Sequence, residues 1–277
     1  MRRLAIAMVL LLAAGLAPKA GAAKTAALVL RGAIIQGGLI IGHAPAGAKI
    51  RLDGAPLRIS PNGLFVFGFG RDAPARAVLE AVLPDGHILR RPLAVARRHY
   101  KIQHIDGLPD KMVTPPASVL ARIKRENAKI AKARARDSAQ TGWASGFQWP
   151  AIGPISGVYG SQRILNGQPR RPHFGVDIAM PVGTPVVAPA PGVVTLAEPD
   201  LYYTGGTLII DHGYGVSSAF LHLSALDVTL GERVRRGQRI GAIGKTGRAT
   251  GAHLDWRVNW FSTRLDPQKL VGPMPAR

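Results

Sequence analysis

His173-Phe-Gly-Val-Asp177 is the first of three short motifs that decide how this chain is interpreted, and His222-Leu-Ser224 and His253-Leu-Asp255 follow it. Imidazole and carboxylate groups bind zinc and carry protons, and a hydrolytic zinc site needs about three protein ligands, a position for water and a nearby base. In an extended chain, residues two or four apart face the same side. His173 can therefore converge with Asp177, and His253 with Asp255, while His222 closes a strand that can lie beside them.

The sequence around these motifs is typical of short strands joined by tight turns. Gly (33) and Pro (22) are abundant, whereas patterns of long helices are scarce. The run Gly231-x-x-Val234-x-x-Gly237-x-x-Ile240-Gly241 requires tight turns between short strands. Apolar or alternating segments predict strands at 184–188, 192–196, 207–211, 217–222 and 254–258.

Residues 26–100 contain a second set of strand patterns, separated by turn signals such as Asp53-Gly54 and Pro84-Asp-Gly86. Strands spaced at roughly 8–12 residues predict a small β-sandwich. The expected strands lie at 28–30, 48–52, 64–67, 78–83 and 93–95.

One helix is predicted at about 116–136, between the two β-rich regions. Thr114 is its cap candidate and Pro115 suits the first helical position. Apolar residues recur near the helical period from Val119 to Ile130, and most other positions are basic. The basic face is either solvated, a contact for an anionic polymer, or part of a lid over the site groove.

The N-terminus has the pattern of a cleaved signal peptide, residues 1–22. Arg2-Arg3 precedes an apolar run from Leu4 to Ala17, and Ala20-Gly21-Ala22 offers a cleavage site. An uncleaved membrane anchor is the alternative. No later run reaches the ~18 apolar residues of a spanning helix, so no transmembrane segment is expected in the mature chain. The periplasm is the expected location, with secretion as the alternative.

Composition narrows the chemistry and the partners. The chain has no Cys, which excludes disulfides and thiol catalysis. Its formal charge of +20 suits an anionic partner. Export argues against nucleic acid and favours an anionic envelope polymer or membrane surface, although a generally solvated basic surface would have the same composition.

Residues 147–272 resemble the lysostaphin/LytM-type zinc metallopeptidases, which cleave peptide cross-links in peptidoglycan. The resemblance rests on the three motifs above, on the turn region 231–244, and on three further segments. These segments are Asp211-His-Gly-Tyr-Gly215, Thr246-Gly-Arg-Ala-Thr-Gly251 and Asp266-Pro267. The resemblance implies a mainly β protein: a C-terminal antiparallel β-sheet or sandwich metallopeptidase domain with an open groove (147–277), a small N-terminal β-sandwich-like module (23–100) and a helical linker (101–146).

The resemblance also implies roles for single residues. His173 and Asp177 would be zinc ligands, and the third ligand would come from the position of Asp255. His222 and His253 would be catalytic, beside the attacking water, as general base and as stabiliser of the oxyanion. His212 matches a position outside the metal shell. The expected substrate is peptidoglycan.

Asp255 departs from the family pattern, because the family has His-x-His where this chain has His253-Leu-Asp255. A carboxylate can bind zinc at about 2.0–2.2 Å. One His and two carboxylates would cancel the charge of the ion and weaken it as a Lewis acid. One Zn²⁺ ion is the expected cofactor, but harder ligands shift the metal preference of the site somewhat toward Mn²⁺.

Three functions remain open at this point. The first is a working peptidoglycan metallo-endopeptidase with His-Asp-Asp ligands. The second is a catalytically weak or inactive family member that binds peptidoglycan or activates another cell-wall hydrolase. The third, a carrier module of the biotinyl or lipoyl type, is disfavoured because Lys245 lacks the neighbours of a modified lysine.

Overall fold

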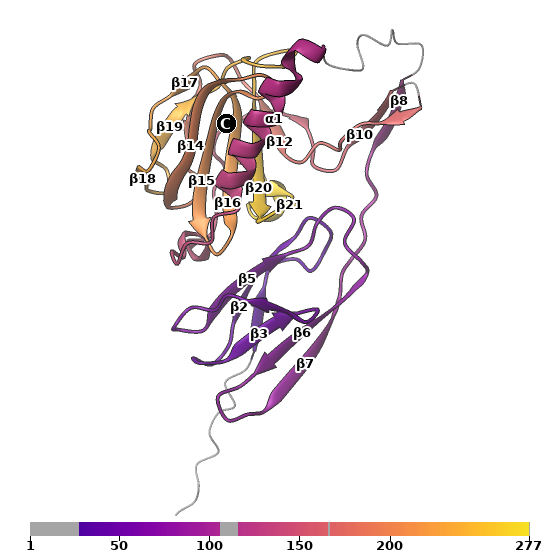
Figure 1. The fold of residues 1–277 in the computed structure, drawn as a ribbon, viewed down its shortest axis with the longest axis vertical. Helices are drawn as coiled ribbons and strands as arrows, with labels where there is room; N and C mark the ends of the chain where they lie inside the picture. Colours follow the sequence, from indigo (N-terminus) through magenta and orange to yellow (C-terminus); the bar gives the residue numbers. More distant parts are fainter. Residues whose placement is uncertain (1–27, 106–115, 166, 277) are drawn as a thin grey trace, which may run out of the picture.

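A computed structural model describes residues 28–105, 116–165 and 167–276 of this protein. The chain is mainly β, as predicted, with strands in both halves and the long helix α1 between them. Two parts lie one above the other, with the strands of the N-terminal part below and the C-terminal sheet with α1 above (Figure 1). The proposed signal peptide, Thr114 and Pro115 lie outside the described residues.

The N-terminal part is built from two sheets around one core. One sheet has the order β1-β2-β5 and the other the order β4-β3-β6-β7. Phe65 and Phe67 from the first sheet share a buried cluster with Ile50 and Leu79 from the second. This arrangement confirms the predicted sandwich. The strands are β1 (Val29–Arg31), β2 (Leu39–His43), β3 (Lys49–Leu52), β4 (Ala55–Leu57), β5 (Leu64–Gly68), β6 (Arg76–Val82) and β7 (Ile88–Ala94).

The described part of the segment between the two parts contains strand β8 (Ile102–Ile105) and helix α1. Strand β8 pairs in parallel with β10 (Gln162–Leu165), which in turn pairs with β11 (Gln168–Pro169). Helix α1 (Ala117–Arg134) agrees with the predicted helix. None of the helices in the described part of the chain combines the length and the apolar character that crossing a bilayer requires.

The C-terminal part contains an 8-stranded sheet with the order β18-β14-β15-β16-β20-β12-β9, and β21 pairs with β20. A 3-stranded sheet, β13-β19-β17, packs against one of its faces, because Val186 and Ile240 share a core with Phe220 and Trp256. We call this the core face. The strands are β9 (Ile155–Gly157), β12 (Val176–Ala179), β13 (Pro185–Val187), β14 (Gly192–Leu201), β15 (Gly205–Gly213), β16 (Val216–Leu223), β17 (Ala225–Leu226), β18 (Arg233–Val234), β19 (Arg239–Ala242), β20 (His253–Trp260) and β21 (Thr263–Leu265), with short 3-10 helices η2 (Gly142–Ser145) and η3 (Pro267–Lys269).

The opposite face of the 8-stranded sheet is covered over part of its area by α1. Ala133 and Ile130 of the helix pack against a small cluster that includes Ala219 and Leu221 of β16. Figure 1 shows α1 lying along the sheet beside β14, β15 and β16. Directly paired residues on antiparallel strands present their side chains to the same face. Since Ala219 pairs with Arg257, this face continues into the part of β20 that carries the predicted site, and we call it the site face.

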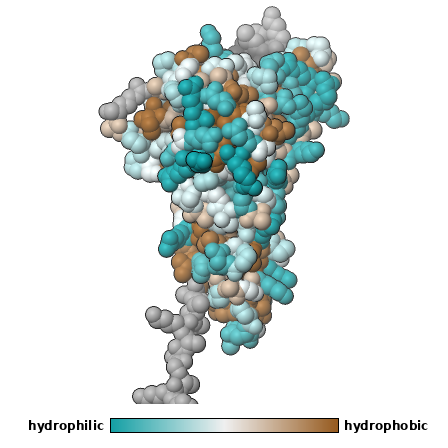
Figure 2. Space-filling model, turned by 90° about the vertical axis from the view of Figure 1, so that its left-hand side faces the viewer, coloured by the Kyte–Doolittle hydropathy of each residue, from teal (hydrophilic) through white to brown (hydrophobic). Residues whose placement is uncertain are grey.

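The two parts of the chain also contact each other. Leu39 and Val66 from the N-terminal part belong to the main core of the C-terminal part. Arg98 Nη1 lies 2.7 Å from Asp266 Oδ2, in an ion pair whose carboxylate is almost fully buried. Viewed from the side, hydrophilic residues cover much of the wider upper part (Figure 2). The exact domain boundaries stay a prediction.

Candidate metal centre

Neighbouring strands bring the first and third motifs together. β12 and β20 are antiparallel neighbours in which Asp177 and Asp255 are direct partners. His173 precedes β12, and its Nε2 lies 3.0 Å from Asp177 Oδ1 and 3.5 Å from Asp255 Oδ2. One potential ligand atom from each of these three residues lies within 4.8 Å of the others. We call this group the ligand cluster.

A glycine between His173 and Asp177 permits this convergence. The chain bends at Gly175 rather than remaining extended from His173 onward. A Cβ at Gly175 would overlap Asp255 Oδ1 and would lie 2.7 Å from the carbonyl oxygen of Trp256. The close approach of the two segments therefore requires glycine at this position.

The ligand cluster fits a divalent metal ion. His173 Nε2 and Asp177 Oδ1 are buried and make no hydrogen bond, although they face each other. His173 Nδ1 lies 3.2 Å from the carbonyl oxygen of Val158, which leaves Nε2 to face the carboxylates. One imidazole nitrogen and two carboxylate oxygens form a donor set that suits Zn²⁺, and Mn²⁺ as a harder alternative. A metal-binding imidazole commonly donates its other N–H to such a backbone carbonyl.

The charges in the cluster favour proton or metal binding at His173. Burial lowers the pKa of the His173 imidazole, but its interactions with Asp177 and Asp255 outweigh burial and raise this pKa to about 10. Without a metal, a proton at Nε2 therefore stabilises the two carboxylates. A metal ion would take the place of that proton.

Arg257 is a component of this site that the sequence analysis missed. Its Nε lies 3.0 Å from both carboxylate oxygens of Asp255, and its Nη2 lies 2.5 Å from Asp255 Oδ2. Asp255 is only 3% exposed. Burial would raise the pKa of this carboxyl, but Arg257 and His173 outweigh burial and lower it. The signal was present, because a spacing of two on one strand places Asp255 and Arg257 on the same face.

The two predicted catalytic histidines lie together beside the ligand cluster. The ring centroids of His222 and His253 are 4.7 Å apart, and His253 Nε2 lies 3.9 Å from Asp177 Oδ1. His222 Nδ1 is 2.8 Å from the carbonyl oxygen of Thr246, and His253 Nδ1 is 2.9 Å from that of Gly251. Each Nδ1 therefore carries the hydrogen in the neutral ring, and each Nε2 is the acceptor.

His222 is held in a special environment. Its φ of 64° lies in the left-handed region, which a non-glycine residue adopts only when its surroundings enforce it. Burial lowers the pKa of the His222 imidazole. The neutral form, which can accept a proton, is therefore favoured at neutral pH.

His212 lies outside the site, as the sequence analysis expected. It is fully buried, with Nδ1 2.8 Å from the carbonyl oxygen of Pro191 and Nε2 2.9 Å from Ser218 Oγ. Ser218 is next to Ala219 on β16 and therefore faces the core instead of the site. Burial lowers the pKa of His212 to about 4.

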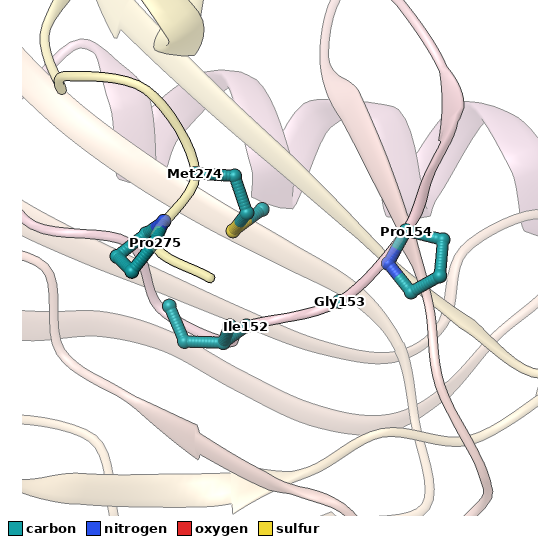
Figure 3. Close-up of a pocket in the computed structure, with 5 residues that line it drawn as sticks. All are labelled: Ile152, Gly153, Pro154, Met274 and Pro275. Carbon is teal, nitrogen blue, oxygen red and sulfur yellow. The ribbon is translucent and has the colours of Figure 1, made fainter. Parts of the chain in front are cut away.

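A pocket elsewhere on the C-terminal part does not coincide with this chemistry. It lies between the segment Ile152–Pro154 and the C-terminal residues Met274 and Pro275 (Figure 3). Its lining carries no titratable side chain. The ligand cluster instead opens toward solvent on the sheet, because the side chains of His173 and Asp177 are 20% and 22% exposed.

Comparisons with known proteins agree with this geometry. Residues 171–267 match the model of peptidase family M23. Over 105 residues, 38% of this chain and 24% of the relative, the sequence is 46% identical to the peptidoglycan DD-endopeptidase ShyA of Vibrio cholerae. It is 40% identical, over the same shares of both chains, to the DD-carboxypeptidase/endopeptidase Mpg of Neisseria meningitidis. The chain thus spans about a quarter of the length of these curated relatives.

A solved structure extends the similarity beyond the C-terminal part. A crystal structure from Pseudomonas aeruginosa, whose description names peptidase M23, is 32% identical with a TM-score of 0.62. The match covers 85% of this chain and 94% of that one, so it includes the N-terminal β-rich part as well as the sheet that carries the ligand cluster. Together with the family match at residues 171–267, this similarity shows that the chain belongs to peptidase family M23.

Proposed function

We propose that this protein is an exported zinc metallo-endopeptidase that hydrolyses peptide bonds in the cross-links of peptidoglycan. His173, Asp177 and Asp255 would hold the metal, and His222 and His253 would be the catalytic residues. The observation that carries the proposal is the ligand cluster, in which His173 Nε2 and Asp177 Oδ1 are buried without hydrogen bonds. The names of the relatives support peptidoglycan as the substrate.

A divalent ion held by the ligand cluster would polarise the scissile carbonyl and make a water more acidic. The chain itself supplies the proton transfers. One of the two histidines accepts a proton from the attacking water at Nε2 and returns it to the leaving amine. The lowered pKa of His222 favours it for the acceptor role at neutral pH. The other histidine would help to stabilise the developing oxyanion.

Arg257 supports Asp255 as the third ligand. One histidine, two carboxylates and one guanidinium carry a net charge of −1, which equals the charge of a set with two histidines and one carboxylate. A divalent ion at this site would therefore keep a net charge of +1 and its Lewis acidity, contrary to the cancellation expected from His-Asp-Asp ligands alone. The contacts of Arg257 also fix Asp255 with Oδ2 toward His173.

Digestion of purified sacculi tests the proposal. The mature chain loaded with Zn²⁺, and in parallel with Mn²⁺, would be incubated with sacculi, and a duplicate would contain EDTA. We expect new peptide ends, identified by mass spectrometry, that EDTA abolishes. Intact sacculi with either metal, from a protein that is folded and binds the ion, would instead favour the inactive family member that binds peptidoglycan or activates another hydrolase.

The location follows from the same proposal. A cell-wall substrate requires export, for which residues 1–22 would supply the signal peptide. We propose the periplasm as the site of action, with an anionic envelope polymer as a further partner of the basic chain. Fractionation of cells that produce a tagged copy tests this proposal. A tag that remains in the cytoplasm at full precursor mass would contradict it.

A further inference from the structure

Arg134, the last residue of α1, is a cation without an anionic partner in the described part of the chain. Among the residues that the structure describes, it donates no side-chain hydrogen bond and forms no ion pair, and its Nε is buried with no acceptor. Two other cations of the same helix are paired, Arg122 with Glu126 and Lys129 with Glu198 at 2.7 Å. The cations of this described helix that form no ion pair are exposed, unlike Arg134; they are Lys124, Arg125 and Lys132. A buried charge without a partner is costly, so such groups are normally paired. Arg134 is half-buried, and its buried Nε without an acceptor leaves the guanidinium free to bind an anionic ligand.

The end of α1, where Arg134 lies, packs on the site face. The neighbouring residue Ala133 packs in one cluster with Ala219 and Leu221 of β16. These two residues pair directly with Arg257 and Asp255 of β20. The end of α1 therefore borders the part of the sheet that carries the ligand cluster.

The electrostatic neighbours of Arg134 locate it further. After burial, the charges that lower the pKa of its guanidinium are those of Arg257 and Arg171. Arg257 is two residues after Asp255, and Arg171 is two residues before His173. Arg134 is thus close to the segments that carry two members of the ligand cluster.

The three arginines do not share one role. Arg257 is engaged by Asp255 through both carboxylate oxygens. Arg171, like Arg134, makes no side-chain hydrogen bond or ion pair among the described residues, and it is exposed. Two guanidinium groups therefore remain available near the segments that carry the ligand cluster. Guanidinium groups bind carboxylates with matched, often bidentate geometry.

We propose that Arg134, assisted by Arg171, binds a carboxylate of the peptide substrate next to the scissile bond. The inference rests on the proposed peptidase function and specifies which substrates it prefers. The residue that releases the amine during cleavage is the natural carrier of this carboxylate, because the cations lie near the segments that carry the ligand cluster. α1 then acts as one wall of the substrate groove, which is more specific than a solvated basic face.

A matched pair of probes tests the proposal. The probes are a fluorescently labelled peptide that ends in D-Ala-D-Ala with a free carboxylate, and the same peptide with a terminal carboxamide. Binding is measured by anisotropy to the zinc-loaded full mature chain that carries His253→Gln, which slows cleavage of the probe. The variants are Arg134→Gln and Arg134→Lys. Lys132→Gln, which removes an exposed cation from the same helical turn, is the matched control.

We expect the chain with Arg134 to bind the carboxylate probe about tenfold more tightly than the carboxamide, the size of one charge-assisted hydrogen bond. Arg134→Gln should reduce this preference to less than about twofold, with Arg134→Lys in between, whereas Lys132→Gln should retain it. The thermal midpoint of Arg134→Gln should not fall, because the substitution removes a half-buried cation that has no anionic partner among the described residues. A preference that survives in Arg134→Gln would overturn the proposal, as would equal weakening of both probes with a lower midpoint.

The experiment separates this inference from the proposed function. If sacculi are cleaved but Arg134→Gln leaves the preference for the carboxylate intact, the subsite is wrong and the peptidase assignment stands. If the preference depends on Arg134 but sacculi are never cleaved, the chain recognises the peptide without hydrolysing it.

Discussion

Replacement of Asp255 by histidine, which restores the ligand pattern of the family, should weaken zinc binding instead of improving it. The reason is that Arg257 donates hydrogen bonds from Nε and Nη2 to the carboxylate of Asp255, and this partner would be lost. The side chain of Arg257 is 27% exposed and that of Asp255 is 4% exposed, so the cation would be left largely buried beside a divalent ion. The total charge of the metal-bound site would rise by one.

The size of the effect follows from the loss of a buried partner. Breaking a buried ion pair from one side costs about 3–5 kcal/mol. Partial exposure of Arg257 reduces this to about 2–3 kcal/mol, or roughly 30- to 150-fold in the zinc Kd. The double variant Asp255→His/Arg257→Gln has two histidines, one carboxylate and no arginine. Its charge equals that of the natural site, so its zinc affinity should return to within about tenfold.

Four proteins complete the measurement: the natural chain, Asp255→His, Arg257→Gln and the double variant. Zinc Kd values are determined by competition with a chromogenic chelator, and the coupling energy is calculated from the cycle. Arg257→Gln alone should bind zinc at least as tightly as the natural chain but hydrolyse sacculi more slowly, because the ion loses its net charge. Additive effects of the two substitutions, or a single Asp255→His variant that binds zinc as tightly as the natural chain, would refute the charge argument.

Three further predictions concern the surroundings of the site. His253→Gln and His222→Asn, the latter chosen because asparagine tolerates positive φ, should each lower sacculus cleavage at least about 100-fold. Their zinc Kd and thermal midpoint should stay unchanged, and full activity in both variants would refute the proposed proton transfers. Gly175→Ala should displace Asp255 and weaken zinc binding, because the added Cβ would overlap the carboxylate. Gly272→Ala is the control, because a Cβ there meets no atom within 4 Å, and it should leave zinc binding unchanged. Equal zinc affinities of the two variants would contradict the steric argument. Burial lowers the pKa of His212 from 6.5 in the unfolded chain to about 4 in the folded chain. The free energy of unfolding should therefore be highest above pH 6.5 and should fall, by up to about 3 kcal/mol, as the pH decreases from 6.5 to 4. Urea denaturation of the natural chain and of His212→Gln at pH 7 and pH 5 measures this, and an equal loss in both would count against it.

Local patterns in the sequence predicted much of the fold. The alternation in 254–258 and the apolar run 207–211 predicted strands that the structure extends to β20 and β15. Turn signals predicted the sandwich, although β2, with its Leu39-Ile-Ile-Gly-His43 sequence, was not predicted. Its glycine accounts for this, since Gly42 weakens the local strand signal but is needed where the ring of Phe65 approaches the backbone.

The contacts of the site between strands that are distant in the sequence could not be predicted from local patterns. A spacing of two predicted that His253 and Asp255 share a face, and the same rule covered Arg257. The pairing of Asp177 with Asp255, however, depends on β12 lying beside β20. Local patterns could not predict the position of α1 either. An apolar stripe predicts that a helix packs against the protein, but it does not predict which face of which sheet the helix covers.

Asp255 should therefore be judged together with its neighbours on the strand. Taken alone, a second carboxylate in the ligand cluster suggests an ion of low acidity and a weakened enzyme. Two positions further along β20, Arg257 contributes the opposite charge and contacts both oxygens of Asp255. A decayed site has no reason to retain both members of such a pair beside His173 Nε2 and Asp177 Oδ1, which are buried and lie 3.0 Å apart. The pair instead has the properties of a substitution at the proposed ligand position whose charge is balanced within the same strand.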